Sequence, residues 1–211
     1  VLDNSSRDAA REEIKEICRQ RNVPYLGLPR NPEWSPNRSH GIALNWTYYN
    51  LIQHVRPEVF GFVDHDCFPV KPVDIVQRMA GKTVYGHRAV AKADAPWAPW
   101  AGFCFFRFPR VDGLKLDFNP RIEFGLDTGG GNWKVLYRTL KAEDVVPAKH
   151  HEFVLPIAGA SQECDVFDDA FLHLGRASYG TSFSKADYRR LLSDHIWDTY
   201  LGGRSHRLIE P

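Results

Sequence analysis

The stretch Val59-Phe60-Gly61-Phe62-Val63-Asp64-His65-Asp66 decides the fold that this sequence predicts. Its first five residues carry no polar side chain, which is typical of a strand buried on both faces in a parallel sheet covered by helices. Such a strand delivers the next residues to the carboxyl edge of the sheet, where open α/β sheets bind their ligands. Two carboxylates one residue apart at that edge favour a divalent cation, because magnesium, calcium and manganese prefer oxygen ligands. The alternative is that Asp64-His65-Asp66 is only a polar turn.

Strand and helix patterns alternate along the first half of the chain, which predicts an α/β fold with a mainly parallel sheet, of the Rossmann type, flanked by helices. Short apolar runs predict the strands, and apolar residues at helical spacing predict the helices. The predicted strands cover 1–2, 25–28, 59–63, 83–86 and 102–106, with a loop over 29–39. Five helices are predicted: one after Ser6, one that includes Leu44 to Val55, one that begins at Pro72, one that includes Trp133 to Leu140, and one from about Lys185 to Tyr200.

Length, charge and cysteine content exclude several classes of protein. The chain has 211 residues, a length that predicts one domain. Its net charge is +1 and 25% of its residues are charged, so its charge gives no argument for nucleic-acid binding. It contains neither a signal peptide nor an apolar run of the roughly 20 residues that span a bilayer, so we expect a cytoplasmic protein, whether free or at the inner face of a membrane. The four cysteines are widely spaced, which predicts buried, reduced thiols rather than disulfides.

Five motifs follow one another along the chain. They are Val1-Leu2-Asp3-Asn4-Ser5-Ser6, the segment Asn37 to Asn45, Asp64-His65-Asp66, Asp127 in Gly125-Leu126-Asp127-Thr128-Gly129-Gly130, and His173 in Phe171-Leu172-His173-Leu174-Gly175. Over residues 1 to about 180, this order resembles family 2 of the inverting nucleotide-sugar glycosyltransferases, which have the GT-A fold. The first strand of that family, which precedes the V-D-N-x-S motif, has no counterpart here. Together with the start at Val1, this predicts a fragment, a processed product, or another segment in that place.

The resemblance implies a set of residues that contact the nucleotide-sugar donor. The Asp3 carboxylate would accept a hydrogen bond from the nucleotide base, with Asn4 beside it. Asn37, His40 and Gly41 would contact the nucleotide from the second motif, where Gly41 also permits a close approach of the backbone. The structural alternatives are that Asp3 caps the first helix and that the other residues belong to an ordinary loop and helix start.

The resemblance also implies a metal site and a general base. Asp66 would ligate Mn²⁺ or Mg²⁺ directly, His173 would complete the site, and Asp64 would reach the ribose or the metal through water. Asp127 would be the base, although an aspartate before threonine and glycines is also a turn and cap signal. Trp100 would stack on a sugar ring. The rival bases are Glu163, Asp165, Asp168 and Asp169.

These roles predict transfer of a sugar from a nucleotide-diphosphate sugar to a hydroxyl of a sugar, lipid or protein, by metal-dependent single displacement with inversion. The single domain 1–211 would consist of a nucleotide- and metal-binding half (1–110), an acceptor half (111–184), and a C-terminal helix and tail (185–211). That helix packs on the domain or, alternatively, serves the acceptor cleft, a membrane or a second subunit. Two other functions stay open: a nucleotidyltransferase, and a non-catalytic module that binds a nucleotide or sugar.

Overall fold

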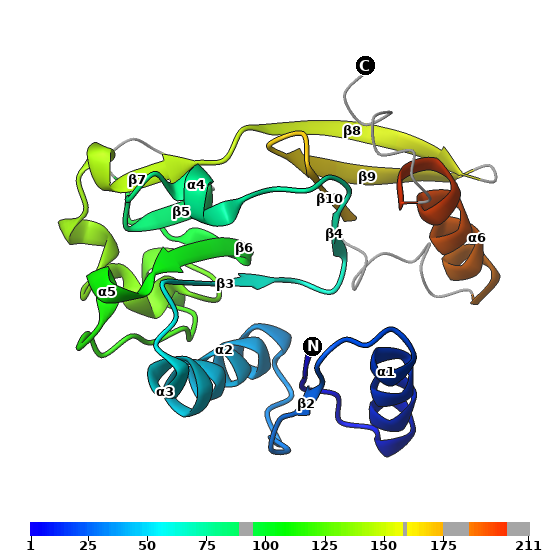
Figure 1. Ribbon diagram of the computed structural model, residues 1–211, viewed down its shortest axis with the longest axis horizontal. Helices are drawn as coiled ribbons and strands as arrows, with labels where there is room; N and C mark the ends of the chain where they lie inside the picture. Colours follow the sequence, from blue (N-terminus) through cyan, green and yellow to red (C-terminus); the bar gives the residue numbers. More distant parts are fainter. Residues whose placement is uncertain (89–94, 158–159, 175–185, 202–211) are drawn as a thin grey trace. The chain divides into compact units, whose positions relative to one another are not determined.

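The chain folds into two compact units in the computed structural model, which describes residues 1–88, 95–157, 160–174 and 186–201 (Figure 1). The first unit comprises Val1–Glu58, Ala89–Ala98 and Phe108–Leu140, and the second comprises Val59–Arg88, Pro99–Arg107 and Lys141–Pro211. Helices and several sheets are present, so the predicted α/β class is confirmed. Segments of the two units alternate along the chain, so the unit boundaries do not coincide with the predicted division at residue 110.

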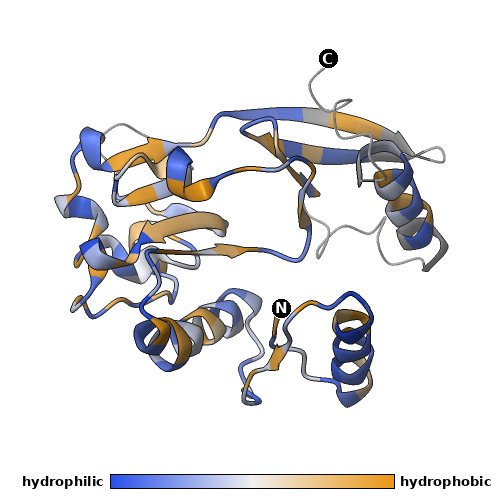
Figure 2. Cartoon of the chain, viewed as in Figure 1, coloured by the Kyte–Doolittle hydropathy of each residue, from blue (hydrophilic) through white to orange (hydrophobic). Residues whose placement is uncertain are grey.

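The first unit begins with a small parallel pair of strands joined through a helix. Strand β1 (Leu2–Asp3) pairs with β2 (Leu26–Gly27), and helix α1 (Asp8–Gln20) connects them. Cys18 is the buried residue of α1, and Figure 2 shows that the rest of this helix is mainly hydrophilic. The strand, helix and strand predicted at the start of the sequence are therefore confirmed.

The helical part of the first unit departs from the prediction at two places. Helix α2 (Pro36–Thr47) starts inside the predicted loop, because a proline at the first helical position is already fixed at a helical φ and has no N–H left unpaired there. The helix predicted over Trp133 to Leu140 is wrong. Short 3₁₀ turns replace it, because glycine disfavours a helix and three consecutive glycines precede Trp133. Leu136 has a φ of −135°, which is outside the helical range. The unit also contains a π-helical turn (Tyr48–Ile52), α3 (Gln53–Val55), α5 (Phe108–Val111) and 3₁₀ turns at Ile122–Phe124, Gly130–Trp133 and Tyr137–Thr139.

Among its described residues, the second unit contains two four-stranded sheets and two α-helices. One sheet has the order β3-β6-β5-β7, and the other has the order β4-β10-β9-β8. The strands are β3 (Val59–Val63), β4 (Cys67–Pro69), β5 (Val84–Arg88), β6 (Pro99–Arg107), β7 (Val145–Pro147), β8 (His150–Ile157), β9 (Ala160–Phe167) and β10 (Phe171–Leu174), with helices α4 (Ile75–Met79) and α6 (Ala186–Ile196), a 3₁₀ turn (Ala142–Asp144) and a π-helical turn (Trp197–Leu201).

The sheets are antiparallel or mixed, which differs from the predicted mainly parallel sheet. Among the strand pairs of the described residues, only β1–β2 and β5–β7 are parallel. Strand β3 has the predicted bounds, but burial on both faces is wrong: Phe60 and Phe62 are buried, whereas Val63 is exposed. An antiparallel sheet can leave one face in water, and a run without polar side chains does not reveal which arrangement applies.

The two faces of the β4-β10-β9-β8 sheet pack in different ways. On one face, Val166 and Leu172 join Leu192, Ile196 and Tyr200 of the C-terminal helical segment in a buried cluster. On the other face, aromatic rings from this sheet and the β3-β6-β5-β7 sheet form a second cluster, which includes Tyr85, Phe103, Phe105, Phe167 and Phe171. Helix α6 is therefore part of the core, which confirms the prediction that it packs on the domain.

Truncating Leu192 is expected to destabilise the protein by about 2–5 kcal/mol, because its side chain is only 2% exposed and Leu192→Ala leaves a cavity. The matched control is Leu191→Ala, one residue earlier, where the side chain is 44% exposed and the expected change is within about 0.5 kcal/mol. Urea unfolding of both variants measures the difference. Equal stabilities would contradict the role of α6 in the core.

Two further sequence predictions can be compared with the structure. All four cysteines are free and buried, as predicted. None of the helices in the described ranges is long and apolar enough to cross a membrane.

Candidate functional site

The acidic turn Asp64-His65-Asp66 connects the two sheets of the second unit. The backbone N–H of Asp64 donates to Gly102 O at 3.0 Å, which continues the pairing of β3 with β6. The next residues form β4, where Cys67 lies opposite His173 of β10, and the N–H of Leu174 donates to Asp66 O at 2.9 Å. The strand pairing therefore places Asp66 beside His173.

His173 is held between two carboxylates. Its Nδ1 lies 2.8 Å from Asp165 Oδ2, and its Nε2 lies 3.9 Å from Asp66 Oδ1. Asp165 is directly opposite His173 in the β9–β10 pair. The hydrogen bond with His173 lowers the pKa of Asp165, and one with His150 adds to this effect, so the carboxylate is ionised and accepts the Nδ1 proton. With Nδ1 bonded to Asp165, Nε2 is the ring nitrogen that lies nearest Asp66, an arrangement also found in histidines that ligate metals.

Trp100 and Asp64 border the same histidine. The Trp100 ring centroid is 4.4 Å from that of His173. A Cβ atom on Gly102 would overlap both the Trp100 ring and Asp64 Oδ2, so the glycine allows these two side chains to lie together. The structure therefore brings together four residues predicted from sequence: Asp64, Asp66, Trp100 and His173.

The pKa of the Cys67 thiol reflects the negative charges that surround it. Burial raises the pKa of its thiol, and the charges of Asp66, Asp64 and Asp165 raise it further. The thiol is therefore protonated in the metal-free protein. The carboxylates of Asp64 and Asp66 and the imidazole of His173 are the candidate donors, a set that suits Mn²⁺ and allows Mg²⁺.

The predicted nucleotide contacts Asp3 and Asn4 lie in the first unit. Asp3 is 4% exposed, and its carboxylate accepts bonds from Ser5 N and from Tyr25 Oη, both at 2.8 Å. Burial opposes its ionisation, but these hydrogen bonds and the charge of Arg11 prevail and lower the pKa of Asp3. Asn4 donates to Ser39 Oγ of α2 at 3.0 Å. Since Arg7 is the N-cap residue of α1, Asp3 does not cap that helix.

Asp127 lies in an ordered loop of the first unit beside the start of α2. Its Oδ1 accepts from Thr128 N at 2.7 Å, and Thr128 Oγ1 donates to Asn37 O at 3.1 Å. The Asp127 side chain is exposed, and its backbone O accepts from Gly130 N at 2.8 Å. The first turns of α2 therefore lie beside several predicted residues. Asn37 belongs to α2, Asn4 bonds to it through Ser39, and Asp127 is linked to it through Thr128. Asp3 precedes Asn4 in the chain.

Gly41 and His40 follow on the same helix. A Cβ atom on Gly41 would lie 2.8 Å from Phe118 O and 2.9 Å from Asn119 Cα. The close approach that needs this glycine is therefore to the protein's own backbone, and the predicted approach to a nucleotide is not required to explain it. His40 is half-buried one residue earlier.

The rival bases are distributed over β9 and the turn that follows it. Glu163 is exposed on β9, on the same face as Asp165. Asp168 and Asp169 occupy the left-handed region in the tight turn to β10, with φ of +52° and +55°. Asp169 Oδ1 is 3.9 Å from His151 Nδ1, and Asp165 is engaged by His173 and His150.

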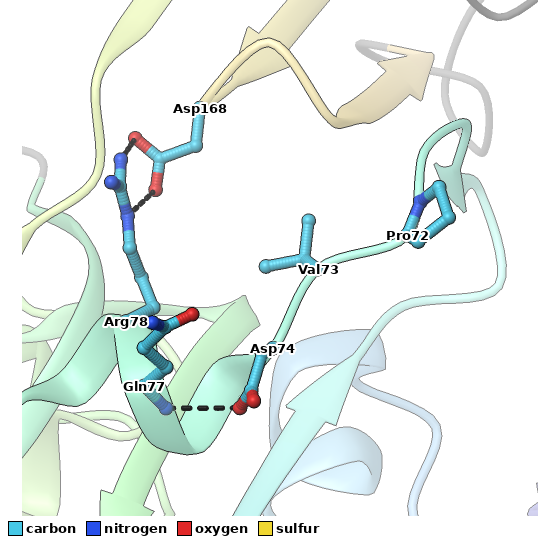
Figure 3. A pocket seen from close by; sticks show the side chains of 6 residues that line it. All are labelled: Pro72, Val73, Asp74, Gln77, Arg78 and Asp168. Carbon is cyan, nitrogen blue, oxygen red and sulfur yellow. Dashed lines mark hydrogen bonds and ion pairs between the residues drawn. The ribbon is translucent and has the colours of Figure 1, made fainter.

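Asp168 also lines a hollow with Pro72, Val73, Asp74, Gln77 and Arg78 (Figure 3). Arg78 binds both Asp168 oxygens, at 2.9 and 2.6 Å, so its charge is neutralised within the protein. Tyr85 Oη and Lys149 N donate to the same carboxylate at 2.5 and 2.8 Å. This hollow therefore has a structural ion pair at its edge, and we do not interpret it as a phosphate pocket.

Asp168→Asn is expected to lower stability at neutral pH by about 1–3 kcal/mol, because it removes a charged acceptor of several hydrogen bonds. Burial opposes ionisation of Asp168, but its hydrogen bonds prevail and lower its pKa below the ordinary 3.8. Its contribution is complete above that value and is lost as the pH falls through the lower pKa of the folded state. Urea unfolding at pH 7 and in acid should show the two proteins converging. Asp169→Asn, with a half-exposed side chain, is the control; a pH-independent difference would contradict the assignment.

Sequence reasoning missed two residues of this face. His150 Nε2 lies 2.8 Å from Asp165 Oδ1, and Glu152 is directly opposite Asp165 in the β8–β9 pair. Donor atoms of His150, Glu152 and Asp165 all lie within 4.8 Å of one another. The run of four polar residues from Lys149 to Glu152 was the available signal, but its partner strand was not evident from sequence.

Comparison of the chain with protein-family models, with curated proteins and with solved structures finds no match. The resemblance to the glycosyltransferases is therefore carried by the motifs alone. What the protein does has to be argued from its own geometry.

Proposed function

We propose that this protein is a glycosyltransferase of the GT-A type that transfers a sugar from a nucleotide-diphosphate sugar to an acceptor hydroxyl, with metal-dependent inversion by single displacement. The observation that carries the proposal is the pair Asp66 and His173, which the β4–β10 pairing holds with Nε2 and Oδ1 3.9 Å apart. Asp165 engages Nδ1 of His173, so Nε2 is the ring nitrogen that would bind a cation. The order of the sequence motifs supplies the reaction class.

Asp66 and His173 would hold Mn²⁺ or Mg²⁺, with Asp64 acting directly or through water. Such a cation would supply Lewis-acid stabilisation of the negative charge on the leaving diphosphate. The Trp100 ring, 4.4 Å from the His173 ring, supplies an apolar face of the kind on which a sugar stacks. Trp100 and Asp64 would therefore contact the donor sugar and ribose.

The nucleotide contacts would come from Asp3, Asn4, Asn37, His40 and Gly41. The Asp3 carboxylate accepts hydrogen bonds from the backbone and side chain of Ser5 and from Tyr25, and it keeps some acceptor capacity because each carboxylate oxygen has two lone pairs. Asp3 is also ionised, as an acceptor for an N–H of a nucleotide base should be.

Asp127 would be the general base. Its carboxylate is exposed, while hydrogen bonds of its backbone and of Thr128 fix the loop that carries it. It would accept the proton of the acceptor hydroxyl as that oxygen attacks the anomeric carbon. One base without a second nucleophilic carboxylate suits a single displacement with inversion.

Calorimetry with UDP, GDP and dTDP, each with and without Mn²⁺, tests the proposal. Manganese-dependent binding of one nucleoside diphosphate is the expected result, and it also identifies the base of the donor. Metal-independent binding of nucleotide or sugar would favour a non-catalytic module instead. Pyrophosphate release from a nucleoside triphosphate and a sugar phosphate would favour a nucleotidyltransferase. The acceptor, whether sugar, lipid or protein, then follows from assays with the identified donor.

A further inference from the structure

A second group of potential ligands lies on the exposed end of the β8–β9 hairpin, outside the Asp66–His173 pair. It consists of His150 and Glu152 of β8 and Asp165 of β9. Glu152 and Asp165 are directly opposite in the antiparallel register, and His150 lies on the same face, two residues before Glu152. This face is accessible, because the side chains of His150 and Asp165 are 26% and 25% exposed.

The opposed carboxylates are an unfavourable arrangement unless a positive charge lies between them. Like charges directly opposite one another across two strands destabilise a sheet. Asp165 is compensated through His150 and His173, whereas Glu152 adds a second negative charge to the same row. A bound divalent cation would neutralise both carboxylates.

Two of the three ligands are already oriented. The His150 ring lies 4.5 Å from the His87 ring and 5.5 Å from the Phe167 ring, and its Nε2 is directed at Asp165 Oδ1. The other Asp165 oxygen is bound to His173, which fixes the plane of the carboxylate. Glu152 is the exposed, adjustable member.

We propose that His150, Glu152 and Asp165 form a second cation site, which binds zinc. Ligands of tetrahedral zinc lie about 3.4 Å apart, and the 2.8 Å separation of His150 Nε2 from Asp165 Oδ1 opens to that distance with small side-chain rotations. The proton shared by these two atoms leaves to solvent when the metal binds. The imidazole favours zinc over magnesium and calcium, and three protein ligands leave one position for water.

This site is independent of the proposed function, although Asp165 touches both sets of residues. Asp165 presents Oδ1 to His150 and Oδ2 to His173, so a substitution of Asp165 would affect both sites and could not distinguish them. Glu152 belongs only to the second site, and Asp66 belongs only to the first. These two residues therefore allow each site to be removed separately.

The test is equilibrium dialysis against Zn²⁺, with the bound metal counted per chain in wild type, Glu152→Gln, His150→Gln and Asp66→Ala. Glu152→Gln and His150→Gln are each expected to lose one zinc ion, or to weaken it at least about tenfold. Asp169→Asn is the matched control, because it removes a carboxylate from the neighbouring β9–β10 turn and asparagine tolerates the left-handed backbone. Near-UV circular dichroism checks that the variants are folded.

Retention of wild-type zinc stoichiometry and affinity in both Glu152→Gln and His150→Gln would overturn the second site. A loss in Glu152→Gln with none in Asp66→Ala would support the second site, and the metal site of the proposed function is then judged by the manganese calorimetry alone. The reverse pattern would contradict the second site alone.

Discussion

Asp66→Ala is expected to abolish manganese-dependent binding of the nucleoside diphosphate, with an affinity loss of about 100-fold or more. The variant removes the carboxylate that lies 3.9 Å from His173 Nε2, and a single imidazole with a water-mediated Asp64 holds a divalent cation poorly. The fold should persist, because the bond from Leu174 N goes to the backbone O of Asp66 and the side chain belongs to neither core cluster. Calorimetry with and without Mn²⁺ measures the change.

His65→Ala is the control for this experiment. It changes the adjacent residue of the same turn, whose side chain is exposed, and metal-dependent binding should stay at the wild-type level. If a well-folded Asp66→Ala protein binds the nucleotide with undiminished dependence on manganese, the metal site is wrong and the proposed function loses its main support.

Asp127→Asn is expected to lower the rate of sugar transfer by about 10² to 10⁴-fold while donor binding stays near normal. The amide keeps the size of the side chain and can still accept the bond from Thr128 N, so the loop retains its geometry. It cannot accept the proton of the acceptor hydroxyl. Single-turnover transfer from the nucleotide sugar identified by calorimetry separates the chemical step from donor binding.

Glu123→Gln provides the matched control for the base. It neutralises an exposed carboxylate in the same 3₁₀ and loop region of the first unit, and its transfer rate should equal that of wild type. A wild-type rate in Asp127→Asn would move the role to Glu163, the exposed rival on β9. Asp168 is less suited to the role, because Arg78, Tyr85 and Lys149 already occupy its oxygens.

Local patterns in the sequence predicted individual elements better than their pairing. Strand β3 has the predicted bounds, and helix α1 follows Ser6 as predicted. The direction of the neighbouring strand could not be predicted in the same way. Strand β6 is antiparallel to β3, and the apolar run Val59–Val63 is equally compatible with either direction.

The candidate site shows the same division. Asp64, Asp66, Trp100 and His173 were predicted from motifs, and the structure brings them together. The contacts of Asp165 with His150 and His173 depend on the β8–β9–β10 register, which local sequence does not encode. Sequence therefore identified Asp165 only as a rival base and did not identify His150 or Glu152.

The bond between Leu174 N and Asp66 O joins the first segment of the second unit to its last segment. During synthesis, the acidic turn leaves the ribosome long before its histidine does, whereas the β8–β9 hairpin can form as soon as its own residues have emerged. Divalent cations in the cell therefore meet a nascent chain with carboxylates but without the imidazole partner. We expect high-affinity metal capture to be one of the last events of co-translational folding, and amide exchange at Leu174 to report when it becomes possible.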